Sequence, residues 1–245
     1  MELILAWTRN RTFVEAASLS LLVNVVVFLL ALFVGEAILR LWRKQKVADP
    51  PLPLSRSEVA LAAACVVLNS VVMLAGWLLF VRGIVNVDAD PSPLRWLVDL
   101  VILTIVMDLA MYVTHRAAHH PIAFKYVHGI HHVYDKPRPL TLFVLHPIEV
   151  LGFGGLWIAV LCTHAFSLGG MLLYLTLNTT FGVVGHIGVE PLPRTWGKLV
   201  RLVGTSTFHA RHHQDPTSNY GFYTTVWDRL FKTLGKTYDE KFGTR

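Results

Sequence analysis

Five runs of apolar residues restrict this chain of 245 residues to a helical membrane fold. Crossing a bilayer takes about 20 mainly apolar residues, and residues 19–41, 59–81 and 94–114 each provide such a run. Residues 148–163 and 170–184 are shorter and rich in glycine, and we expect a hairpin there that either crosses the membrane or only dips into it. The sequence therefore predicts an all-α bundle of four to five spans, in a single domain that occupies the whole chain.

The composition agrees with membrane insertion. Hydrophobic residues make up 53% of the chain and charged residues 16%, and the mean hydropathy is +0.50, all on the apolar side of a soluble globular average. The formal net charge is +6, but the basic residues are unevenly spread, so we interpret them as a topology signal and expect no nucleic-acid partner. Cys65 and Cys162 lie in apolar stretches, where we expect small buried side chains and no disulfide or cysteine-ligated metal.

The distribution of basic residues predicts the orientation of the spans. The loop after the first run, the loop after the third run and the tail from residue 190 are rich in Lys and Arg, whereas the loop after the second run carries one Arg and two Asp. By the positive-inside rule the three basic segments face the cytoplasm. Five spans then put the N-terminus outside and a cytoplasmic helical cap, residues 116–140 and 190–245, over one end of the bundle. The lack of a cleavable signal pattern fits a bacterial inner membrane, with an endoplasmic reticulum origin as the alternative.

Eight of the twelve histidines fall into three tight clusters: His115 and His119; His128, His131 and His132; His209, His212 and His213. Side chains three or four residues apart lie on one face of a helix, so each cluster can direct its imidazoles at one point. Imidazole is a common ligand of iron, copper and zinc. Eight convergent imidazoles exceed the four positions of a tetrahedral zinc site, but they suit two metal ions that keep positions open for a substrate or dioxygen. The sequence therefore predicts a metalloenzyme.

Two polar residues precede the first cluster on the same helical face. The spacing puts Asp108 and Tyr112 in one stripe with His115 and His119, so both are candidates to hold the second ring nitrogen of a ligand imidazole. A structural hydrogen bond between helices is the alternative role for Asp108. We do not expect His120 to bind metal, because it lies off this face and precedes a proline.

Several further motifs accompany the histidine clusters: His146-Pro-Ile-Glu149, Gly185-His186-Ile-Gly188, His213-Gln-Asp215-Pro216, Asn219-Tyr220-Gly221 and Trp227-Asp228-Arg229-Leu230-Phe231. Together with HxxxH, HxxHH and HxxHH in this order, they resemble the fatty acid hydroxylase/sterol desaturase superfamily of integral-membrane di-iron enzymes. The resemblance covers about residues 108–233. It implies a dioxygen-dependent oxidoreductase with two non-haem iron ions bound almost wholly by histidine.

The resemblance also implies roles for individual residues. The metal ligands would be the eight clustered histidines and a ninth, with no catalytic residue separate from them: His115, His119, His128, His131, His132, His186, His209, His212 and His213. For His146 two roles stay open, metal ligand or orientation of the hairpin with Glu149 as its hydrogen-bond partner. Glu149 and Asp215, like Asp108 and Tyr112, would support ligands without binding the metal themselves.

The implied reaction is hydroxylation of a C–H bond in a lipid, fatty acyl or sterol-like, that enters from the bilayer. Desaturation at the same site is the close alternative, because one ligand set serves both reactions. The sequence has no GxGxxG after a strand and no cysteine set for an iron–sulfur cluster, so electrons would come from an external ferredoxin, haem carrier or reductase. Zinc outcompetes ferrous iron at nitrogen sites, so the purified protein can contain zinc.

A membrane metal transporter or a non-catalytic metal-binding protein is the alternative from another functional class. Transport sites generally lie near the membrane midplane on discontinuous helices. The histidines of this chain gather at one predicted membrane face, which favours an enzyme.

We predict that His131→Ala or His212→Ala abolishes activity and lowers the metal content, because each removes a ligand. His164→Ala should do neither, since His164 is expected on the opposite side of the membrane. Metal analysis of the purified variants tests this, and loss of metal from His164→Ala would contradict the predicted topology.

Overall fold

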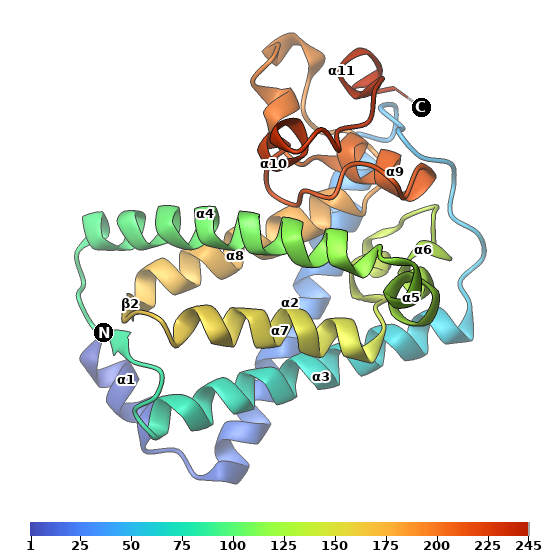
Figure 1. The fold of residues 1–245 in the computed structure, drawn as a ribbon. Coiled ribbons are helices and arrows are strands. Elements are labelled where there is room, and N and C mark those ends of the chain that lie inside the picture. Colours follow the sequence, from blue (N-terminus) through green and yellow to red (C-terminus); the bar gives the residue numbers. More distant parts are fainter. Residues whose placement is uncertain (245) are drawn as a thin grey trace.

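The computed structural model describes residues 1–244 and contains five long helices, the first of which crosses the others (Figure 1). They are α2 (Phe13–Leu41), α3 (Arg56–Val81), α4 (Pro93–Ala118), α7 (Pro147–Leu161) and α8 (Leu168–Gly185), preceded by the short α1 (Glu2–Arg9). Helix α2 packs on α3 and α8, α4 packs on α8, and α3 packs on α7. The predicted all-α bundle is confirmed.

Four of these helices are long and apolar enough to cross a membrane, judged by length and composition: α2, α3, α4 and α8. All five predicted runs fall on helices, with small shifts at the ends. The largest shift is in α2, which begins at Phe13 instead of residue 19. The reason is a capping box, in which the Thr12 hydroxyl accepts from the Glu15 N–H and the Glu15 carboxylate accepts from the Thr12 N–H. Such reciprocal bonds satisfy donors that the first helical turn leaves free.

Helices α7 and α8 form the predicted hairpin, and its turn reaches the end of the bundle where α3 connects to α4. Strand β2 (Phe166–Ser167) in this turn pairs in parallel with β1 (Val87–Asp88) in the α3–α4 connection. Arg95 at the start of α4 adds a contact, with its Nη2 3.0 Å from the His164 Nε2 atom. A 15-residue helix such as α7 rises about 22 Å, which is most of a hydrocarbon core of about 30 Å. The hairpin therefore extends along the bundle as far as the neighbouring long helices.

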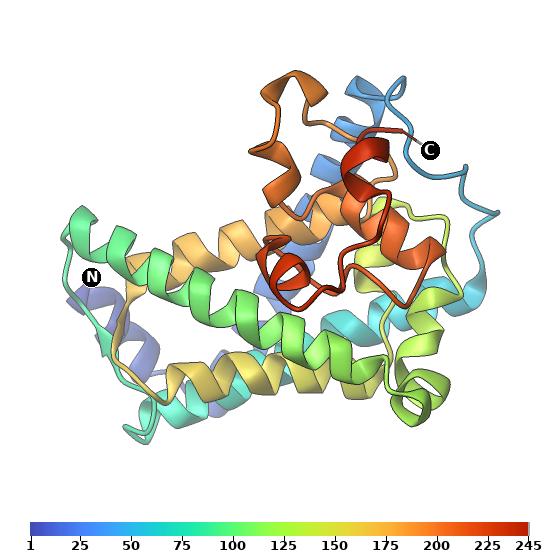
Figure 2. The ribbon, with the colours of Figure 1, turned by 45° about the horizontal axis from the view of Figure 1, so that its top comes forward.

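Two segments cover the other end of the bundle and correspond to the predicted cap (Figure 2). The first contains α5 (Pro121–Ala123), the π-helical turn η1 (Phe124–His128), α6 (Gly129–His132) and the 3₁₀ turn η2 (Pro139–Phe143). The second contains η3 (Arg194–Trp196), η4 (Val200–Leu202), α9 (Ser206–Gln214), α10 (Val226–Leu230) and α11 (Tyr238–Lys241). The cap therefore brings together residues separated by a whole membrane hairpin.

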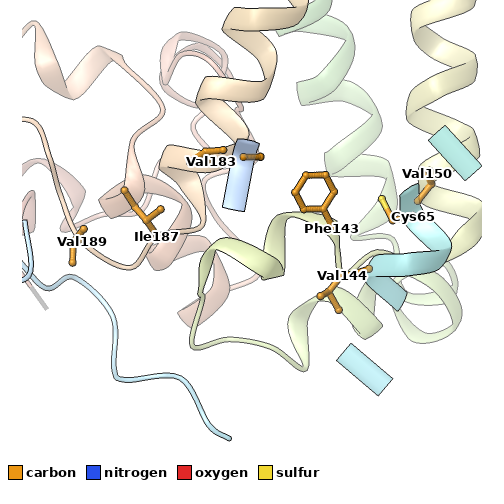
Figure 3. Close-up of a cluster of buried hydrophobic side chains, with 9 residues drawn as sticks. Cys65, Phe143, Val144, Val150, Val183, Ile187 and Val189 are labelled. Atoms are coloured by element: carbon orange, nitrogen blue, oxygen red, sulfur yellow. The ribbon is translucent and has the colours of Figure 1, made fainter. Parts of the chain in front are cut away.

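A buried apolar cluster joins the bundle to the cap (Figure 3). It combines residues of α2, α3, α7 and α8 with Phe143 and Val144 from the loop before α7. The same loop is tied down by an ion pair, because the Arg138 Nε atom lies 3.0 Å from Oε1 of the buried Glu58. Close packing at Pro139 requires Gly35, where a Cβ atom would lie 2.7 Å from the proline Cβ atom. These contacts fix the position of Val144, whose carbonyl faces a histidine of the cap.

The two cysteines differ in their surroundings. Cys65 is buried as expected, whereas the expectation of a buried Cys162 is wrong. Cys162 is exposed because it ends α7 at the hairpin turn, where the helix no longer packs on its neighbours. Neither cysteine is in a disulfide.

Cys162 provides a test of whether the hairpin crosses the membrane. If its turn and the cap lie on opposite sides, a membrane-impermeant maleimide added to sealed vesicles should label Cys162 from the side opposite the cap. The exposed Lys198, changed to Cys in a Cys162→Ser background, marks the side of the cap. The buried Cys65 should stay unlabelled, and labelling of both marker positions from one side would contradict a crossing hairpin.

Candidate metal centre

Nine histidines converge where the cap meets the bundle, and their ring nitrogens form two groups. We call the first the five-histidine group; it consists of His115, His119, His128, His132 and His212. We call the second the four-histidine group; it consists of His131, His186, His209 and His213. Within each group the candidate ligand nitrogens lie within 4.8 Å of one another. These are the nine residues that the resemblance implied as ligands.

Each HxxHH motif contributes to both groups. In a helix, residues four apart share a face, whereas adjacent residues point about 100° apart. His128 and His132 therefore reach the five-histidine group, while His131 turns to the other group. On α9 the division is reversed, because His209 and His213 join the four-histidine group and His212 the other. Each of the two histidine-bearing cap segments thus supplies rings to both groups and connects them.

The histidines from the bundle lie at helix ends. His115 is in the last turn of α4, and His119 is the residue that ends this helix. His186 ends α8 in the same way. The membrane helices therefore carry three of the nine imidazoles to the boundary of the cap, where the short helices supply the other six.

Five of the imidazoles have a defined partner for their Nδ1 atom. Four of these partners are backbone carbonyl oxygens: Tyr220 for His115 (2.8 Å), Val144 for His131 (3.1 Å), Gly182 for His186 (2.7 Å) and Ser218 for His212 (2.7 Å). The fifth is the Glu149 carboxylate, whose Oε1 atom lies 2.5 Å from Nδ1 of His128. A carbonyl oxygen and an ionised carboxylate only accept, so with these partners Nδ1 carries the ring hydrogen and Nε2 of the neutral ring is a bare acceptor.

The bare Nε2 atoms face one another. They are 3.2 Å apart between His115 and His128, and 3.4 Å apart between His131 and His186. Burial lowers the pKa of His128 and His131 to about 4, so these rings are neutral at pH 7 and neither atom of a pair can donate a hydrogen bond. Two facing lone pairs repel unless a cation lies between them.

The spacing fits metal coordination. Nitrogen ligands about 2.1 Å from one ion lie about 3.0–3.4 Å apart at octahedral or tetrahedral angles, which matches the observed pairs. The donor set is therefore suited to one metal ion in each group. Among residues 1–244, the buried Nδ1 atoms of His132 and His213 have no hydrogen-bond partner, so these two rings contribute to the centre through Nε2 alone.

Glu149 contacts two histidines, the His128 ring and the backbone of its expected partner His146, whose N–H donates to Oε2 of Glu149 at 3.4 Å. Its carboxylate contacts the His128 ring, whereas the Nδ1 atom of His146 accepts from the Ile148 N–H at 3.1 Å and caps α7. His146 belongs to neither histidine group. Of the two roles left open for His146, the structure therefore favours orientation of the hairpin over metal binding.

The predicted contacts of Asp108 and Tyr112 with imidazoles are not formed in the structure. The Asp108 carboxylate accepts hydrogen bonds from Tyr223, Thr224 and Trp227 instead. The Tyr112 hydroxyl lies 3.0 Å from the Thr233 hydroxyl. Both residues therefore attach the loop around residues 220–233 to α4. The partners of the imidazoles are mostly backbone carbonyls, which have no signature in sequence.

Asp215 supports His212 indirectly, through the turn that follows α9. Its carboxylate accepts from the Thr217 hydroxyl at 2.6 Å and from the Ser218 hydroxyl at 3.2 Å. These bonds stabilise the turn that presents the Ser218 carbonyl to His212. They also lower the pKa of the Asp215 carboxyl.

One supporting residue escaped the sequence analysis. Glu190 is buried, and its Oε2 atom accepts from the Thr205 hydroxyl and from both the N–H and the hydroxyl of Thr207, at 2.6–2.9 Å. This carboxylate holds the start of α9, the helix that carries three histidines. The signal in the sequence was an acidic residue that directly follows the apolar Ile187 and Val189.

The other two histidines that were not expected to bind metal lie outside both groups. His164 is in the hairpin turn beside Arg95, at the end of the bundle opposite the cap. His120 contributes to the wall of an open cavity of about 1010 Å³ that reaches His119. The other residues that line this cavity are mostly apolar: Tyr112, Val113, Arg116, Ala117, Ile122, Ala123, Tyr220 and Phe231.

Comparison with known proteins gives a consistent set of matches. The family model described as fatty acid hydroxylase matches residues 100–233, more than half of the chain. Methylsterol monooxygenase 1 of Danio rerio is 33% identical over 152 residues, covering 60% of this chain and 50% of that protein. The Delta(7)-sterol 5(6)-desaturase of Aspergillus fumigatus is 24% identical over 246 residues (97% and 68%), and human lathosterol oxidase is 25% identical over 235 residues (91% and 77%).

The chain spans about half the length of the methylsterol monooxygenases that it matches. No solved structure matches it.

We predict that Glu149→Gln lowers the metal affinity of the five-histidine group by about 10–100-fold, the usual effect of losing an outer partner of a ligand histidine. His146→Ala should retain its metal, because the His146 ring only caps α7. Metal bound per chain, measured against chelators of increasing strength, tests both variants. Equal metal loss in the two variants would contradict the separate roles of Glu149 and His146.

Proposed function

This chain belongs to the fatty acid hydroxylase family, and on that basis we propose that it is an integral-membrane oxidoreductase that uses two iron ions and dioxygen to hydroxylate a lipid. The observation that carries the proposal is the pair of histidine groups, in which nine imidazoles direct their Nε2 atoms at two points. Five nitrogen donors are more than a tetrahedral zinc site holds, and four donors fill it. Around an octahedral ion, both sets leave at least one position open. Such open positions are what a co-substrate needs.

The residues of the chain hold and orient the metals. Bound iron would supply the electron transfer and dioxygen activation that an unreactive C–H bond requires. The carbonyls of Tyr220, Val144 and Ser218 fix the ring hydrogens at Nδ1, so that Nε2 is always the ligand atom. The buried rings stay neutral at pH 7, since burial and neighbouring imidazoles lower the pKa of His132 to about 2. The rings therefore have the protonation state and orientation that metal binding requires.

We propose that the lipid binds in the open cavity that reaches His119. One face of α4 forms its wall with Val113, Arg116 and Ala117, and Phe231 stacks on Tyr112 with ring centroids 5.5 Å apart. A mostly apolar wall excludes water from the reacting carbon and accepts a ring system or an acyl chain. The relatives are named for sterols, which favours a sterol-like substrate over a fatty acyl chain.

The topology of this proposal follows the charges of the loops. We propose that the whole chain is one membrane enzyme domain and that its cap faces the cytoplasm, where an external electron donor has access. The positive-inside rule supports this orientation. Location in a bacterial inner membrane rests on the sequence alone.

Desaturation is the second candidate reaction. It is favoured by the two relatives that align over most of this chain, a sterol desaturase over 97% and a lathosterol oxidase over 91%. Hydroxylation is favoured by the family model and by the methylsterol monooxygenases. The position of the substrate carbon in the cavity decides between the two outcomes.

Lipid mass spectrometry of cells that express either the wild type or His212→Ala, grown under isotopically heavy dioxygen, tests the proposed reaction. We expect a sterol-like lipid that gains heavy oxygen with the wild type alone. Loss of two hydrogens from a lipid would indicate the desaturase. No difference between the strains, with an electron donor present, would contradict both reactions.

Ala117→Trp separates the cavity from the metal centre in the same experiment. The indole would fill the cavity beside His119 without removing a ligand, so product should fall at least 10-fold while the metal content stays unchanged. Leu97→Trp, at an exposed position of α4 that does not line this cavity, is the matched control. Full activity of Ala117→Trp would contradict the proposed substrate site.

A further inference from the structure

One peptide unit connects Asp228 to the metal centre. The carbonyl of Tyr220 accepts from Nδ1 of His115 at 2.8 Å, and the N–H of the same peptide unit, on Gly221, donates to Oδ2 of Asp228 at 2.7 Å. The N–H of Tyr220 itself donates to Oδ1 of Asp228 at 2.8 Å. The carboxylate therefore lies one peptide behind a histidine of the five-histidine group.

Asp228 is fully buried, with 0% of its surface exposed. The Thr233 hydroxyl donates a third hydrogen bond, to Oδ1 at 2.7 Å, so the three partners of the carboxylate found among residues 1–244 all act as donors. Two backbone donors cannot reverse their direction, so both carboxylate oxygens act as acceptors. Asp228 is not a member of the ion pairs found among residues 1–244. Its hydrogen-bonding capacity is directed chiefly at the segment that contacts His115.

The backbone at residues 219–221 allows the Asp228 carboxylate to approach the peptide closely. Asn219 has a positive φ of 61°, which turns the chain immediately before the peptide. The turn is held because the Asn219 side chain accepts from the Gly235 N–H at 2.8 Å. At Gly221 a Cβ atom would lie 2.8 Å from Oδ2 of Asp228 and would also meet the Thr224 carbonyl. A glycine there lets the carboxylate reach the peptide N–H.

Hydrogen bonds in a chain polarise one another. A carboxylate that accepts from a peptide N–H makes the carbonyl of that peptide a stronger acceptor, by about 10–30% per bond. The stronger acceptor draws the Nδ1 hydrogen of His115, which raises the electron density at Nε2. Ligand histidines commonly donate directly to a carboxylate, which fixes the tautomer and raises the basicity of the ligand. His128 has this direct arrangement with Glu149.

We propose that Asp228 is a positioning residue that acts on His115 through the Tyr220–Gly221 peptide. It fixes the ring and tautomer of His115 and strengthens its Nε2 atom as a metal ligand in the five-histidine group. The inference rests on the proposed function only in requiring that this group binds a metal ion. It gives a role to the Asp of the Trp227–Phe231 motif and to the Gly of the Asn219–Gly221 motif.

The four-histidine group lacks this support. His131 and His186 donate to the carbonyls of Val144 and Gly182, and no hydrogen bond found among residues 1–244 connects a carboxylate to either of those peptide units. Loss of the Asp228 carboxylate should therefore affect one metal ion and spare the other. A residue that only stabilised the cap would affect both ions.

The test uses the full-length protein in lipid nanodiscs, loaded with Co²⁺ and then exposed to excess EDTA. In Asp228→Asn, the side-chain NH₂ faces one of the backbone donors and the peptide loses its anionic partner. We expect one of the two Co²⁺ ions to leave 10–100-fold faster than from the wild type, with the visible spectrum of that ion shifted. The other ion should leave at the wild-type rate.

Single-site backgrounds identify the ion that is affected. The effect of Asp228→Asn should persist in His186→Ala, where the five-histidine group is intact, and vanish in His128→Ala, where that group is impaired. Asp239→Asn is the matched control, because Asp239 is a half-exposed cap carboxylate paired with Arg229 at 2.6 Å. It should leave both release rates unchanged.

Unchanged release in Asp228→Asn, or equal acceleration of both ions, would overturn the proposal. If Asp228→Asn does not fold, Gly221→Ala keeps the charge but moves the carboxylate away from the peptide, and it should give the same selective loss. None of these measurements uses dioxygen or a lipid. Their outcome is therefore independent of whether the proposed reaction is correct.

Discussion

The histidine site is governed by the close approach of buried imidazole lone pairs, which repel one another unless a cation lies between them. Nine neutral rings meet at the junction of bundle and cap, and facing Nε2 atoms lie 3.2–3.4 Å apart where Nδ1 already holds the hydrogen. While Glu149 is ionised, no rearrangement of hydrogens turns those contacts into hydrogen bonds. The rings come from the bundle helices α4 and α8 and from the cap helices, so the metal ions would also serve as bonds between the two layers.

Buried carboxylates hold the polypeptide around this centre. Asp108 attaches the 220–233 loop to α4, Glu190 fixes the start of α9, and Asp228 accepts from the backbone at residues 220 and 221. Burial raises the pKa of Asp228, although the bonds from Thr233, Tyr220 and Gly221 act in the opposite direction. Each carboxylate replaces lost hydration with backbone and hydroxyl donors, as buried acids must. The cap thus combines this polar framework with a small apolar core of Val200, Phe208, Tyr238 and Phe242.

Much of this arrangement was predictable from residue spacing. Apolar runs located the five helices, and histidines three and four apart identified eight of the nine converging rings. The ninth, His186, was implied only by the family resemblance. The predictions that failed concern individual contacts. Of the two roles open for Asp108, the contact with an imidazole is not formed and its carboxylate binds Tyr223 and Thr224 instead, and Cys162 was expected to be buried. Both errors arise at loops, where neither periodicity nor hydropathy says which group will be the neighbour.

The sequence by itself determined the helical membrane class, the residues of the histidine clusters and their common end of the bundle, because hydropathy and helical periodicity are local properties. Only the tertiary structure decided how the clusters divide into groups of five and four, which ring nitrogen faces inward, and that Asp228 lies behind His115. The division into groups depends on how the short helices pack against α4 and α8. The other two features depend on backbone carbonyls and peptide N–H groups, which every residue type except proline possesses in full. Their partners are set by the packing of the chain and leave no pattern in its sequence.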